Sequence, residues 1–119
     1  MFLELNHRNL DAYKFTRKFV SDCYKLTSHF PPEERYHLTS QIRRAAISVH
    51  LNLSEGSSRK SLAERKRFFE ISRSSIIEID AGLDLAMDLG YFNPDNFGDF
   101  KESIINCFKY LKGLINSSS

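Results

Sequence analysis

Three breaks in the helical pattern divide this chain into four segments, and that division limits its fold more than any other feature. The breaks lie at Pro31-Pro32, at residues 56–61 and at residues 90–95. Between them, apolar residues recur at steps of three and four, which is the period of an amphipathic helix. Short connections make successive helices antiparallel. The sequence therefore predicts an all-α fold, an antiparallel up-down-up-down four-helix bundle. Residues 1–119 form one domain in this prediction, with helices at about 10–28, 33–54, 62–89 and 95–116.

Local signals set the expected ends of these helices. Asn9 is a suitable N-cap for the first helix. Ser61 and Glu64 have the spacing of a capping box at the start of the third helix. Gly56 is the expected stop of the second helix, and Gly90 of the third. Each boundary therefore has a local chemical reason.

The second helix has apolar residues on two sides. A helical wheel places Ile47 and Leu51 away from its core seam, beside Arg44. A helix that is apolar on both sides is buried on both sides, and in so small a bundle only another chain can cover the outer side. The sequence predicts a homo-oligomer with Ile47 and Leu51 in its interface. Two scattered surface aliphatic residues are the alternative, because single exposed apolar residues are common.

Positive charge is concentrated in the middle of the chain. The formal net charge is only +2, but residues 35–73 hold nine Lys or Arg against three acidic residues. Binding to nucleic acid needs several cations on one surface, because each neutralised phosphate releases counterions. The candidate nucleic-acid-binding residues are Arg43, Arg44, Arg59, Lys60, Arg65, Lys66, Arg67 and Arg73. Cations in the first turn of a helix face the positive end of its dipole, so stability alone does not explain their position.

The basic segment is also consistent with two roles that involve no nucleic acid. Its cations could be solvated surface charges, or they could form ion pairs between subunits. Partners for such ion pairs exist in the third helix, whose second half contains Glu78, Asp80, Asp84 and Asp88. A basic half-helix on one chain would then meet an acidic half-helix on the next.

No pattern in the sequence indicates an enzyme. The four histidines have no metal-ligand spacing, and no phosphate-binding glycine loop or HExxH motif occurs. Cys23 and Cys107 lie far apart without a CxxC motif, which favours buried free thiols over a disulfide or a zinc site. No apolar run approaches the ~20 residues of a membrane span. We expect a cytoplasmic protein with no catalytic residues, no cofactor, no metal and no membrane partner.

Several stretches strongly resemble the central motif of a bacterial family. They are Tyr36–Val49 (YHLTSQIRRAAISV), Asn52–Arg59 (NLSEGSSR), Arg67–Glu78 (RFFEISRSSIIE) and Leu89–Tyr91 (LGY). The family consists of four-helix bundle proteins encoded in intervening sequences of 23S rRNA genes. The accessory protein of diversity-generating retroelements looks like a relative. The resemblance covers nearly the whole chain.

This resemblance implies a bundle that assembles as a ring, typically a pentamer. It also implies a role in binding RNA or DNA and no known catalytic activity. One residue departs from the family pattern: His50 stands where the family usually has proline. We therefore expect the second helix to run straighter here than in its relatives.

Together these observations predict a non-enzymatic homo-oligomer that binds nucleic acid. The expected ligand is structured RNA such as rRNA, held by a basic surface on the second and third helices. The alternative is a protein-interaction scaffold, or an accessory subunit for a nucleic-acid-processing protein such as a reverse transcriptase.

Overall fold

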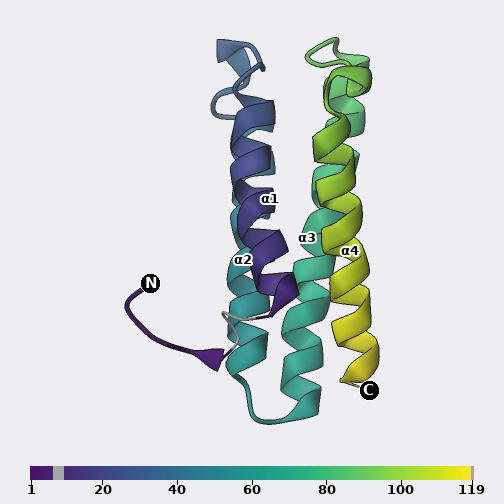
Figure 1. Cartoon of the computed structure of the whole chain (residues 1–119). Coiled ribbons are helices and arrows are strands. Elements are labelled where there is room, and N and C mark those ends of the chain that lie inside the picture. The colour runs from purple at the N-terminus through teal and green to yellow at the C-terminus, as the bar shows by residue number, and fades with distance from the viewer. Residues whose placement is uncertain (7–9, 119) are drawn as a thin grey trace.

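Four α-helices form most of the computed structural model, which describes residues 1–6 and 10–118. The helices are α1 (Asp11–Thr27), α2 (Leu38–Ser58), α3 (Leu62–Asp88) and α4 (Gly98–Ser117), with 3₁₀ turns η2 (Pro32–Glu34) and η3 (Pro94–Asn96). Successive helices run antiparallel, with α1 and α2 on one side of Figure 1 and α3 and α4 on the other. No strand occurs in the described residues. The predicted all-α four-helix bundle is confirmed.

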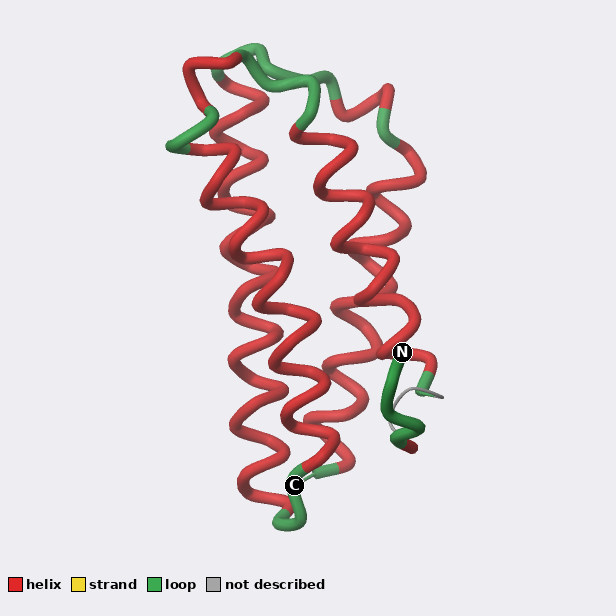
Figure 2. The backbone as a smooth tube through the Cα atoms, turned by 90° about the vertical axis from the view of Figure 1, so that its left-hand side faces the viewer, coloured by secondary structure: helices red, strands yellow, loops and turns green. Residues whose placement is uncertain are grey.

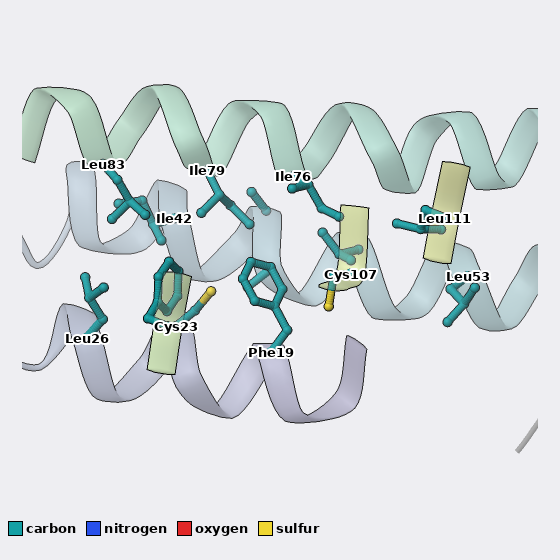
Figure 3. Packing of buried hydrophobic residues seen from close by; sticks show 14 of the residues in the cluster. Phe19, Cys23, Leu26, Ile42, Leu53, Ile76, Ile79, Leu83, Cys107 and Leu111 are labelled. Atoms are coloured by element: carbon teal, nitrogen blue, oxygen red, sulfur yellow. The ribbon is translucent and has the colours of Figure 1, made fainter. Parts of the chain in front are cut away.

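Each helix packs against two neighbours around a common core. The contact between α2 and α3 is the largest; α1 lies against α2 and α4, and α3 also lies against α4. All connections lie at the two ends of the bundle (Figure 2). Residues from all four helices converge in the core (Figure 3), including Phe19, Cys23, Leu26, Ile42, Leu53, Ile76, Ile79, Leu83, Cys107 and Leu111.

The observed ends of α2 and α4 differ from the predicted ones. The helix α2 begins at Leu38 and not near Glu33, because Pro32–Glu34 form a separate 3₁₀ turn. Likewise α4 begins at Gly98, because Asn93 accepts a hydrogen bond from the backbone N–H of Asp95 at 3.0 Å and starts η3. Asn9, the expected N-cap of the first helix, lies outside the described residues.

The helix α3 has both of the predicted ends. At its start, the Ser61 side chain accepts a hydrogen bond from the Glu64 backbone N–H at 3.1 Å. At its end, Gly90 has a φ of 77°, and the N–H of Tyr91 reaches back to the carbonyl of Ala86 at 2.9 Å. This is a Schellman motif, in which glycine takes the left-handed position without steric cost.

Gly56 is not the stop of α2, so this prediction is wrong. The helix continues through it to Ser58, and Gly56 is buried. A Cβ at this position would lie 2.9 Å from Phe68 Cβ and 2.9 Å from the Phe69 ring. The glycine therefore allows α2 to approach α3 closely, a packing role that a helix-end pattern does not reveal.

His50 lies inside α2, which is one uninterrupted helix from Leu38 to Ser58. Its Nδ1 is hydrogen-bonded to Thr16 Oγ1 at 2.9 Å, and its ring lies 4.7 Å from that of Tyr13. The histidine thus links α2 to α1. A proline here would remove a helical hydrogen bond and also this polar contact.

Candidate nucleic-acid interface

Five of the predicted basic residues gather at one end of the bundle. Arg59 and Lys60 lie in the connection between α2 and α3, and Arg65, Lys66 and Arg67 lie in the first two turns of α3. We call these five residues the loop cluster; the connection that contains the first two is at the bottom of Figure 1. The connection has only three residues. The cations in it therefore lie close to those at the start of α3.

Two arginines of the loop cluster are held by the end of α2. Arg59 forms an ion pair with Glu55 at 2.6 Å, and its guanidinium lies 4.9 Å from the centre of the Phe68 ring. Arg65 Nη2 donates a hydrogen bond to the carbonyl oxygen of Ser57 at 3.2 Å. These contacts stabilise the tight connection, so both residues have a structural role.

The remaining three residues of the loop cluster have no such contacts. Lys60 and Arg67 are exposed, and Lys66 is half-buried. Among the hydrogen bonds and ion pairs of the described residues, none involves the side chains of these three. The start of α3 adds the positive end of a helix dipole to their charge. This end of the bundle is therefore suited to bind an anionic partner.

Arg43 and Arg44 lie far from the loop cluster. Sixteen residues of helix separate Arg43 from Arg59, a rise of about 24 Å. Arg43 Nε donates to Thr27 Oγ1 at 2.8 Å, and its guanidinium lies 4.5 Å from the centre of the Tyr24 ring. The contacts of Arg43 therefore fasten α2 to α1.

Arg44, the neighbour of Arg43, is exposed beside a hollow lined by Tyr36 and Leu85. Arg73 lies farther along α3 than the loop cluster, and it is half-buried with no hydrogen-bond partner for its Nε among the described residues. The structure thus does not place the eight predicted cations on one continuous surface. It brings five of them together and leaves Arg43, Arg44 and Arg73 apart.

The two residues predicted for an oligomer interface are exposed. Ile47 is 39% exposed and Leu51 is 59% exposed on the outer side of α2. They lie on the same helix face as Arg44, and the chain covers them only in part. This agrees with the wheel position from which the interface was predicted.

A second apolar surface was not predicted. A groove of about 450 Å³ runs between α3 and α4. Its lining residues are Ile76, Ile77, Asp80, Ile104, Ile105, Phe108, Lys109 and Lys112. Phe108, which lines this groove, is 37% exposed. The groove depends on which residues of two antiparallel helices lie side by side, and no local pattern reports this.

The described residues form no metal site and no reactive thiol. In the part of the chain that the structure describes, no group of three or more His, Cys, Asp or Glu could hold a metal ion. Cys23 and Cys107 are buried free thiols, as predicted. Burial raises the pKa of Cys107 to about 12 and raises that of Cys23 as well. Neither thiol is therefore suited to act as a nucleophile at neutral pH. No helix of the described residues is long and apolar enough to span a membrane.

Comparisons with known proteins agree with the fold and the motifs. The family model of the 23S rRNA-intervening sequence protein matches residues 8–113. The chain also resembles the crystal structure of a protein of unknown function from the S23 ribosomal protein family of Bacteroides thetaiotaomicron, with a TM-score of 0.75 and 18% identity. That match covers 87% of this chain and 97% of the other. At such identity the likeness shows the shared fold alone. No curated protein sequence matches the chain.

Proposed function

Because the chain belongs to the 23S rRNA-intervening sequence protein family, we propose that it is a non-enzymatic, self-assembling protein that binds structured RNA such as rRNA. The observation that supports this function is the loop cluster, in which Lys60, Lys66 and Arg67 have no ion-pair or hydrogen-bond partner among the described residues. The binding surface in this proposal is the end of the bundle formed by the α2–α3 connection and the start of α3.

Phosphate groups are the part of RNA that such a surface would contact. Each cation that neutralises a phosphate releases condensed counterions, so affinity falls as salt rises. Five clustered cations suit the backbone of a folded RNA more than a particular base, because phosphate contacts carry no sequence information. Self-association would place several loop clusters on one particle, and their weak contacts would add through effective concentration.

The proposed function is tested by reversing two unpaired charges of the loop cluster, Lys60→Glu with Arg67→Glu. Binding to rRNA fragments is measured at several salt concentrations by fluorescence anisotropy. We expect at least a tenfold loss of affinity. We also expect the slope of log affinity against log salt to become shallower by about 1.4 to 1.8, because two phosphate contacts are lost.

A matched control reverses two exposed cations at the opposite end of the bundle, Lys25→Glu with Arg35→Glu. It carries the same change in net charge and should bind almost as well as the unmodified protein. If both variants lost the same affinity for RNA, binding would depend on net charge alone and not on the loop cluster. Affinity that does not respond to salt would contradict the proposal directly.

A further inference from the structure

Two separate apolar surfaces of this chain are exposed. The first is the outer face of α2, formed by Arg44, Ile47, Leu51 and Glu55, which we call the α2 face. The second is the groove between α3 and α4, where Ile77 is 52% exposed and Ile105 is 53% exposed. Exposed apolar patches of this kind usually mark sites of association.

A charged residue lies at each end of the α2 face, and the two charges have opposite sign. Along the helix, Arg44 comes first, then Ile47 and Leu51, and then Glu55. Positions 44, 47, 51 and 55 are three or four residues apart, so they share one side of the helix. Along the bundle axis, the face has a cation at one end, two aliphatic residues in the middle and an acid at the other end.

The groove has the opposite order of charge along the bundle axis, and its acidic end lies at the height of Arg44. Three contacts fix the heights of α2 and α3: a Cβ on Gly82 would lie 3.2 Å from Ile42, Ser75 donates to Ser48 at 3.0 Å, and Ser72 donates to the Val49 carbonyl at 2.6 Å. Continuing this antiparallel register places Arg44 level with Asp80, and Ile47 level with Ile77.

The basic end of the groove lies nearer the loop cluster. Asp80 lies toward the end where α4 begins, and Lys109 and Lys112 lie farther along α4, toward the loop cluster. Ile77, Ile105 and Phe108 fall between them. Along the same axis, then, the groove has an acid, an apolar middle and two cations.

We propose that the α3–α4 groove binds the α2 face of a second copy of this chain, with the two bundles side by side and parallel. Ile47 and Leu51 of one copy pack against Ile77, Ile105 and Phe108 of the other. Arg44 faces Asp80 at one end. At the other end, Lys112 lies on the side of Glu55, whose carboxylate also pairs with Arg59 of its own chain at 2.6 Å. This inference rests on the self-assembly in the proposed function and names the surfaces that perform it.

The match in height is the reason to choose a second copy as the occupant. A rotation about an axis parallel to the bundle brings residues of equal height together, and Arg44 and Asp80 form such a pair of opposite charge. An antiparallel arrangement would instead bring Arg44 to the lysines and Glu55 to Asp80, which is repulsive. The charge order therefore selects the parallel arrangement as well as attracting the partner.

The contact joins two different surfaces, so it is heterologous, and every copy uses both surfaces. Parallel copies also have their loop clusters at the same end of the assembly. RNA at that end would meet several basic clusters at once, whereas a two-fold antiparallel dimer would place them at opposite ends.

Cross-linking between engineered cysteines tests the arrangement. Ile47→Cys and Ile77→Cys are prepared separately, then unfolded together, refolded and treated with a short bismaleimide. The native cysteines are buried and do not compete. We expect covalent dimers in the mixture, and none in either variant alone or in the unmodified protein.

Three results would overturn this inference in distinguishable ways. Dimers of Ile47→Cys alone would show a two-fold contact of the α2 face with itself. No cross-link, in a protein that sedimentation shows to be assembled, would exclude the groove while leaving self-assembly intact. Sedimentation as a monomer at micromolar concentration would remove the self-assembly of the proposed function as well.

Charge reversal gives an independent test. Arg44→Asp and Asp80→Arg should each shift the protein toward monomer in sedimentation velocity, and the double variant should recover the assembly. Glu102→Arg is the control, because Glu102 is exposed on α4 outside the groove. Circular dichroism checks that each variant is folded. A double variant as dissociated as the single variants would contradict the proposed pairing.

Discussion

At the scale of single residues, burial decides what the two cysteines can do. Cys23 and Cys107 are both fully buried in the core. Burial is the largest cause of the raised pKa in each case, because a thiolate is poorly solvated among apolar side chains. With a pKa of about 12 for Cys107, roughly one thiol in 10⁴ is ionised at pH 8. These thiols therefore act as small apolar core residues.

We predict that neither thiol reacts with a chromogenic disulfide reagent in the native protein at pH 8. Both should react within minutes in guanidinium chloride, where the thiol pKa returns to about 8.5. As denaturant is added, the rate at which the reagent labels the thiols should follow the rate at which the protein unfolds. Rapid labelling of one thiol per chain without denaturant would show that one of these residues is accessible.

Thiol burial also sets the direction of a pH effect. A group whose pKa is raised by folding stabilises the folded state fully below its unfolded pKa, about 8.5 here. This contribution is lost as the pH rises from there toward the folded pKa of about 12 for Cys107. The free energy of unfolding, measured by urea titration at several pH values, should therefore decline above about pH 9.

At the scale of helices, the packing of α2 on α3 depends on a missing side chain. Gly56 faces Phe68 and Phe69 at a distance that leaves no room for a methyl group. About two turns farther along the same contact, Ser72 and Ser75 donate hydrogen bonds to groups on α2. Small residues and hydroxyl groups thus line this contact, which is the largest in the bundle.

We predict that Gly56→Ala destabilises the protein by about 1–3 kcal/mol, because the added methyl group overpacks a filled contact. The matched control is Gly113→Ala in α4, where a Cβ would meet nothing within 4 Å. Alanine there should stabilise the helix by about 0.5–1 kcal/mol. Urea unfolding at one fixed protein concentration measures the free energy of unfolding of both variants. If both substitutions changed the free energy of unfolding in the same direction, the close-packing explanation would be contradicted.

At the scale of the whole molecule, the proposed assembly links stability to protein concentration. A partner that binds only the folded chain stabilises it by mass action, and Tm then rises with concentration. We predict that Tm of the unmodified protein rises with concentration, and that Tm of Leu51→Asp does not. Calorimetry over a hundredfold range of concentration measures the difference.

Leu89→Asp is the control for this experiment. Leu89 and Leu51 are equally exposed, at 59% each, but Leu89 lies outside both the α2 face and the groove. Its variant should retain the concentration dependence even if its Tm is lower. A constant Tm in the unmodified protein would count against self-association.

Much of this molecule follows from its sequence alone, because helices are specified locally. Apolar periodicity predicted four helices, Ser61 marked the start of α3 and Gly90 its end, and the exposure of Ile47 and Leu51 followed from their position on a wheel. The family motifs in residues 36–91 pointed to the family whose model matches. All of these features depend on residues that are near one another in the chain.

Only the tertiary structure decided which distant residues share a surface. Arg43 and Lys60 are both cations of the basic segment, yet Arg43 contacts α1 while Lys60 has no ion-pair partner among the residues that the structure describes. Gly56 has the pattern of a helix stop, and only the position of Phe68 and Phe69 shows its packing role. The α3–α4 groove likewise depends on the register of two antiparallel helices. Register and side-chain contacts arise from packing between segments far apart in sequence, so local patterns do not specify them.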